Sequence, residues 1–269
     1  MEFRSKGLPM TRQGLADALD RLGLAAGQAA ALWAVFEVET AGLTQGFGFR
    51  PDRRPHILFE RHKFKKFTDG RFNQSHPALS GRPGGYGSLN DQYPKLEAAL
   101  DLCVDHGLGL EPALKSASWG IGQVMGFNHE AAGYASAETM VTDMVQSEDA
   151  QLMAMVGFML DARLDAPLRN HQWRPFARGY NGSGYERNRY HLKLEAQYAR
   201  FSSGSMPNLE VRTAQAALLL LGFAPGKIDG VLGPRTGQAL TGFQIAHQIN
   251  PDGQLTDQTY LRLTQIAFT

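Results

Sequence analysis

Residues 27–40 read GQAAALWAVFEVET, an almost unbroken run of residues that are apolar or favour helices. Glycine at position 42 is typical of a helix end, so the run predicts one helix from Gly27 to Thr40. A helix that is apolar on nearly every side is expected to be buried. The run therefore predicts a mainly α-helical domain with this helix inside it.

Glu39 stands near the end of this predicted helix. At helical spacing it shares one stripe with three apolar residues, Leu32, Val35 and Phe36. Apolar surroundings raise the pKa of a carboxyl group, and cleaving a glycosidic bond needs a carboxylic acid that is still protonated near neutral pH. Glu39 is therefore a candidate general acid. The alternative is a carboxylate at the solvated end of a core helix.

Apolar residues at helical spacing predict further helices on both sides of this run. Their ranges are 11–22, with Thr11 as the N-cap, and then 94–106, 136–163 and 185–200. Residues 43–94 are rich in Gly, Pro, Arg and aromatic residues, and they predict loops with a short strand at HILFE, residues 56–60. Residues 1–201 are expected to form one mainly helical domain with this small β/loop element.

Glu60 is the second candidate carboxylate. It lies in the apolar, strand-like run, directly before Arg61 and His62. A second carboxylate can activate water or act as a nucleophile during glycoside hydrolysis. A structural ion pair with its basic neighbours is the alternative.

Two glycine-rich patches contain candidate sugar contacts. Residues 118–126 read SWGIGQVMG and contain Gln123, and residues 179–184 read GYNGSG and contain Tyr180 and Asn181. Glycine lets the backbone approach a sugar closely, and amide or phenol groups can bond its hydroxyl and acetamido groups. Each patch taken alone is more often a tight turn.

The last quarter of the chain has the pattern of a separate small domain. Residues 202–207 read SSGSMP, the composition of a flexible linker. Residues 229–236 and 252–259 share the pattern D-G-x-L-x-x-x-T, in which an Asp-Gly turn leads into a helix. Together with the Leu-rich segment 211–221, this repeat predicts a three-helix domain over residues 208–269.

Composition excludes several classes of protein. The chain has 27 Lys and Arg residues against 26 Asp and Glu residues, and this net charge of +1 argues against a nucleic-acid partner. Cys103 is the single cysteine, so an internal disulfide is impossible. The sequence contains no zinc-binding motif, and neither a metal nor another cofactor is expected. No signal-peptide pattern and no bilayer-length apolar run is present, so we expect no stable membrane association.

These motifs, in this order, resemble the lysozyme-like superfamily, and more closely the N-acetylmuramidase domains of phage endolysins. The segments that carry the resemblance are VETAG at 38–42, GF at 48–49, RRPHILFERHKF at 53–64 and SWGIGQVMGFN at 118–128. The chain departs from the family pattern at Thr40, where the family has Ser, and at Arg53, where it has Gly. Residues 208–267 resemble the peptidoglycan-binding domains of cell-wall hydrolases.

The resemblance implies an endolysin that cleaves bacterial peptidoglycan between N-acetylmuramic acid and N-acetylglucosamine, and so lyses the host cell. It implies the following site residues: Glu39 and Glu60 as catalytic, and Thr40, Gln123, Tyr180 and Asn181 as substrate contacts.

Such an enzyme is expected to be a monomer that is made in the host cytoplasm. It would act on the cell wall or periplasm after release, with a holin needed for export. Two alternatives remain open: a lytic transglycosylase that forms 1,6-anhydro ends, and a non-catalytic structural protein that binds the wall.

Overall fold

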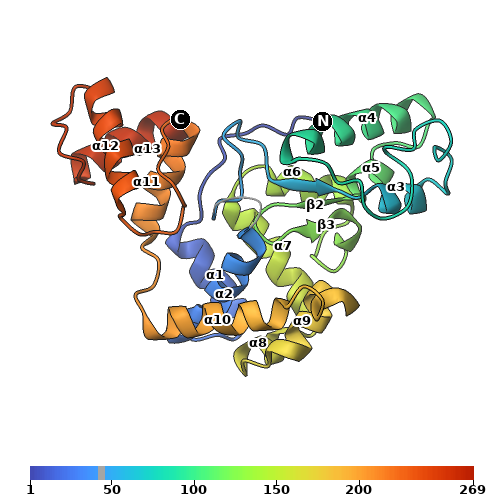
Figure 1. Ribbon diagram of the computed structural model, residues 1–269, viewed down its shortest axis with the longest axis horizontal. Coiled ribbons are helices and arrows are strands. Elements are labelled where there is room, and N and C mark those ends of the chain that lie inside the picture. Colours follow the sequence, from blue (N-terminus) through green and yellow to red (C-terminus); the bar gives the residue numbers. More distant parts are fainter. Residues whose placement is uncertain (42–45) are drawn as a thin grey trace.

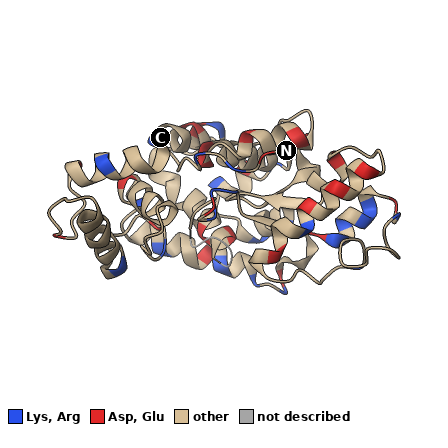
Figure 2. Ribbon diagram, turned by 90° about the horizontal axis from the view of Figure 1, so that it is seen from above, with Lys and Arg blue, Asp and Glu red and all other residues tan. Residues whose placement is uncertain are grey.

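The computed structural model describes residues 1–41 and 46–269. The chain is mainly helical, as the sequence predicts, and it is arranged as a larger N-terminal domain and a smaller C-terminal domain (Figure 1). Within residues 1–41 and 46–269, no helix has both the length and the apolar character that crossing a membrane requires. Basic and acidic residues are interspersed along the ribbon (Figure 2), in keeping with a net charge of +1.

The N-terminal domain combines helices with a small sheet. Its α-helices are α1 (Arg12–Arg21), α2 (Ala29–Thr40), α3 (Arg61–Phe67), α4 (Gln92–Asp105), α5 (Glu111–Leu114), α6 (Ala137–Met144), α7 (Glu148–Asp161), α8 (Asp165–Arg169), α9 (Trp173–Asn181) and α10 (Tyr190–Ser203). Its short 3-10 helices are η1 (Ala26–Gln28), η2 (Leu89–Asp91), η3 (Gly126–Asn128) and η4 (Ser183–Tyr185). Its strands are β1 (Ile57–Phe59), β2 (Ala117–Trp119) and β3 (Val124–Met125).

Helix α2 is the buried helix that the sequence predicts. Every residue from Ala29 to Phe36 is buried, so all sides of its first two turns contact protein. Helix α10 lies along α2 (Figure 1), and Phe201 of α10 contacts the Trp33 ring at 6.4 Å between centroids. The packing leaves only the C-terminal end of α2, where Glu39 lies, partly open.

The sheet is antiparallel, in the order β1-β2-β3. Ile57 pairs with Trp119 and Phe59 pairs with Ala117, so β1 ends where β2 begins. The turn between β2 and β3 needs Gln123 at φ 47°, a left-handed conformation that is uncommon outside glycine. The predicted strand at residues 56–60 is therefore confirmed, with Glu60 directly after it.

Several predicted boundaries differ from the structure. The helix predicted over residues 185–200 begins only at Tyr190. Residues 61–67 were expected to be a loop, but they form α3, because Phe64 is buried between Phe59 and Phe72. The predicted helix 136–163 is two helices, since the hydroxyl of Ser147 caps α7 by accepting from the Ala150 amide. The predicted linker 202–207 is shorter, because α10 continues to Ser203.

The C-terminal domain contains the predicted three helices, α11 (Leu209–Leu220), α12 (Pro234–Ala246) and α13 (Asp257–Phe268). The sequence repeat is also a structural repeat. Gln215 accepts a hydrogen bond from the Gly230 amide at 2.9 Å, and Gln244 accepts one from the Gly253 amide at 2.8 Å. Both glycines have positive φ, 75° and 70°, which the Asp-Gly turns require. Each glutamine thus holds the turn that starts the next helix.

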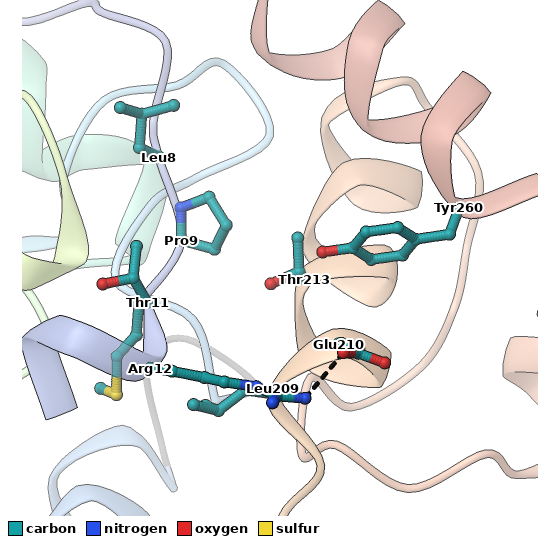
Figure 3. A pocket seen from close by; sticks show the side chains of 9 residues that line it. Leu8, Pro9, Thr11, Arg12, Leu209, Glu210, Thr213 and Tyr260 are labelled. Carbon is teal, nitrogen blue, oxygen red and sulfur yellow. Dashed lines mark hydrogen bonds and ion pairs between the residues drawn. The ribbon is translucent and has the colours of Figure 1, made fainter. Parts of the chain in front are cut away.

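The two domains are in contact, and a cavity of about 350 Å³ lies at their junction (Figure 3). Leu8 to Arg12 line it from one domain, and Leu209, Glu210, Thr213 and Tyr260 line it from the other. Arg12 and Glu210 form an ion pair of 2.7 Å across the junction. Because both side chains are largely exposed, this pair contributes little to stability.

Candidate active site

Glu39 is a partly buried acid at the end of α2. The Tyr190 hydroxyl of α10 donates a hydrogen bond to its Oε1. Burial raises the pKa of Glu39 from 4.5 to about 7, because the charged form is poorly solvated there, and the hydrogen bond from Tyr190 opposes this rise more weakly. Glu39 therefore retains a proton near neutral pH, as a general acid must.

Two tyrosines connect this acid to the small sheet. The rings of Tyr180 and Tyr190 are stacked, with centroids 6.4 Å apart, and the Tyr180 hydroxyl donates to the Gly122 carbonyl at 2.7 Å. Burial and the nearby carboxyl group of Glu39 raise the pKa of both phenols well above 10. Both tyrosines stay neutral donors at neutral pH, and they bring α9, α10 and the β2–β3 turn to the acid.

Tyr190→Phe is expected to shift the pH dependence of activity upward. The lost hydrogen bond favours the ionised form of Glu39, so its removal raises the pKa of Glu39 further. Activity that needs protonated Glu39 should then persist to higher pH, with the alkaline limb moved up by about one unit. The measurement is a pH–rate profile of wall clearing, with Tyr198→Phe on the same helix as the control. An alkaline limb that stays in place or moves to lower pH would contradict this role of Tyr190.

The predicted sugar contacts are placed in different ways. Asn181 is exposed at the end of α9, directly after Tyr180, and its amide is accessible to a ligand. Gln123 instead holds the β2–β3 turn, because its Oε1 accepts from Ser118 Oγ at 2.8 Å and its Nε2 donates to the Gly120 carbonyl at 2.8 Å. Thr40 differs most from the expectation, since it is buried and its hydroxyl donates to the Phe36 carbonyl at 2.6 Å. That placement does not support a sugar contact for Thr40.

Glu60 is held away from the tyrosine pair. Its backbone amide donates to the Ser116 carbonyl, before the start of β2, whereas Tyr180 contacts Gly122, beyond the end of β2. These points lie at opposite ends of the sheet, and Figure 1 shows α3, which follows Glu60, on the far side of the sheet from α2. Glu60 Oε2 lies 3.1 Å from His62 Nε2. This contact is the ion pair of the alternative interpretation only when His62 is protonated.

Sequence reasoning missed Tyr190. It lies among buried residues on α10 with His191 and Leu194, and its spacing is that of an ordinary core residue. Its contact with Glu39 joins residues 151 positions apart, so no local motif indicates it. Among residues 1–41 and 46–269, no group of three or more His, Cys, Asp or Glu side chains is arranged to hold a metal ion.

Comparison with known proteins gives a family match for each domain. Residues 28–202 match the sequence profile of the N-acetylmuramidase family, and residues 207–263 match that of a putative peptidoglycan binding domain. Among solved structures, the chain is similar to the crystal structure of Burkholderia AP3 phage endolysin, with 37% identity and a TM-score of 0.61. That similarity covers 72% of this chain and 71% of the other. No curated protein sequence was found to match.

The chain thus combines a mainly helical fold, a small antiparallel sheet and a partly buried acid at the end of a core helix. The N-acetylmuramidase profile spans more than half of the 269 residues. The chain therefore belongs to the N-acetylmuramidase family, and its C-terminal domain is a peptidoglycan-binding domain.

Proposed function

We propose that the protein is an endolysin that cleaves the peptidoglycan glycan strand between N-acetylmuramic acid and N-acetylglucosamine, with Glu39 as the general acid. One observation carries the proposal: burial beside Tyr190 raises the pKa of Glu39 to about 7. A glycosidase needs such an acid to protonate the leaving oxygen. The similarity to a phage endolysin supports the assignment of this protein as an endolysin.

In this mechanism Glu39 donates its proton to the oxygen that bridges the two sugars, and positive charge develops on the cleaved sugar. Tyr190 then stabilises the carboxylate that remains, because its hydroxyl already donates to Glu39. The same carboxylate next acts as the base for the attacking group. Asn181 is our proposed contact for the sugar, since it is exposed one residue beyond the tyrosine that adjoins Glu39.

A lytic transglycosylase is the second candidate, and one observation favours it. Glu60 is engaged with His62 at the far end of the sheet, so Glu39 can be the single carboxylate of the reaction. With one carboxylate, the 6-hydroxyl of the muramic acid can attack in place of water, and the product is a 1,6-anhydro sugar. Hydrolysis would instead require water that Glu39 itself activates.

Digestion of purified peptidoglycan, followed by mass spectrometry of the released fragments, tests both candidates. Hydrolysis should give fragments that end in a reducible muramic acid, and the transglycosylase should give fragments lighter by one water that borohydride does not reduce. Reducible ends on glucosamine would contradict the proposed cleavage position. Wall binding without fragment release, in solution and in a zymogram, would favour a non-catalytic structural protein.

A further inference from the structure

Arg212 of the peptidoglycan-binding domain forms a buried ion pair with Glu148 of the N-terminal domain. The side chains are 1% and 0% exposed, and the guanidinium contacts both carboxylate oxygens, at 2.5 and 2.6 Å. The same carboxylate accepts the backbone amides of Met10 and Gly48, at 2.7 and 2.8 Å. Arg212 donates a third hydrogen bond to the Gly46 carbonyl at 2.7 Å. One side chain thus ties three segments of the N-terminal domain to α11.

Two aromatic residues of the N-terminal domain pack against apolar residues of the binding domain. Phe47 and Phe49 are fully buried, and they form one apolar cluster with Ala216 and Ile228 of the binding domain. The backbones also approach closely, because a Cβ atom added to Gly46 would lie 2.5 Å from the Ile228 carbonyl oxygen. Residues 46–49 therefore depend on the binding domain for their conformation.

The same domain also reaches the end of α2 that carries Glu39. Lys227 of the binding domain forms an ion pair with Glu37, and Arg200 lies 3.6 Å from the same carboxylate. A small cavity of about 20 Å³ is lined by Thr40 of α2, by Gly46 and by Arg212. The binding domain therefore contacts Glu37 of α2 and borders the same cavity as Thr40.

We propose that Arg212 is a positioning residue for the reaction assigned to Glu39: it fixes residues 46–48 and α7 against the binding domain, which also contacts the end of α2 that carries Glu39. The inference rests on the proposed function. The binding domain is then part of the structure that supports the active site, as well as a module that attaches to the wall. Arg212 does not touch the substrate in this role; it acts through Glu148, Gly46 and the cavity that it lines together with Thr40.

The test uses the full-length protein and soluble peptidoglycan glycan fragments, whose cleavage does not require attachment to an intact wall. Arg212→Met should lower kcat per folded molecule about 10- to 100-fold, because small displacements of catalytic groups have large kinetic effects. The alkaline limb of its pH–rate profile should move to lower pH as water reaches Glu39. If Arg212 only stabilises the fold, Arg212→Met should lower the folded fraction and leave kcat per folded molecule unchanged. Arg262→Met, an exposed arginine on α13, is the matched control.

Arg212→Met leaves Glu148 as a buried carboxylate without its cation, and it can unfold the protein. The double variant Arg212→Met/Glu148→Gln removes both charges of the buried pair. Its glutamine keeps an amide oxygen that can accept from the Met10 or Gly48 amide. We expect this double variant to be more stable than Arg212→Met and still to show the lower kcat per folded molecule. A double variant with wild-type kcat and an unmoved pH profile would overturn the inference.

Hydrogen exchange at the amides of residues 46–49 provides a readout that is independent of catalysis. These amides should exchange faster in both variants, since the tie to the Gly46 carbonyl is lost in each. Unchanged exchange would overturn the inference whatever the activity. If the wild type releases no fragments, the proposed function fails instead, and the exchange rates still decide whether Arg212 holds this segment.

Discussion

Glu39→Gln is expected to reduce the release of glycan fragments about 10²- to 10⁴-fold, while the protein still binds purified wall. Glutamine has almost the same shape as glutamate, and its amide oxygen can accept the hydrogen bond from Tyr190. The variant therefore keeps the surroundings of the site and loses only the proton that the leaving oxygen needs. Wall binding is expected from the C-terminal domain, which matches a putative peptidoglycan binding domain, and it should be unaffected.

Fragment release is measured by mass spectrometry, and wall binding by co-sedimentation with purified wall. Glu195→Gln is the matched control, because it makes the same chemical change at an exposed position on α10. The control should retain wild-type activity. Near-normal activity in Glu39→Gln would remove Glu39 from the mechanism and would assign the general acid to another residue.

The same substitution should stabilise the folded protein at neutral and alkaline pH. The pKa of Glu39 is about 7 in the folded state and about 4.5 in an exposed chain. Below pH 4.5 the group is protonated in both states, and its contribution to stability is fully present. Between pH 4.5 and 7 the unfolded chain releases the proton first, so stability is lost as the pH rises through the folded pKa.

Above pH 7 the wild type should be less stable than Glu39→Gln by about 3 kcal/mol, since each unit of pKa difference corresponds to about 1.4 kcal/mol. At pH values above 7, the Tm of Glu39→Gln should be several degrees higher than that of the wild type. Below pH 4.5 this difference in Tm should disappear. Glu195→Gln should show little change across this range. A gain that is the same at every pH would mean that burial of the charged carboxylate is not its cause.

Local sequence patterns predicted much of the fold. The apolar run of α2 is a buried helix with Glu39 at its open end, because helical spacing alone places Glu39 beside apolar residues. Thr11 caps a helix as predicted, since its hydroxyl accepts an amide three residues ahead. The repeated Asp-Gly turns are likewise confirmed, because a left-handed turn followed by a helix depends on only a few adjacent residues.

Contacts between distant residues were not predictable in this way. The helical state of α3 depends on Phe64 packing against Phe59 and Phe72. The position of Glu60 depends on the register of β1 against β2 and on its contact with His62. A strand pattern in the sequence indicates that a segment is extended, but it does not specify which end of the strand lies nearer to Glu39.

The sequence by itself determined the local conformations, the order of the two domains and the acid at the end of its apolar helix, because each depends on residues within one or two turns. Only the tertiary structure decided that Tyr190 bonds that acid and that Arg212 joins the domains through Glu148. Burial and long-range hydrogen bonds exist only after the chain has folded. The proton affinity of Glu39, and with it the chemistry of the site, is therefore a property of the packed molecule.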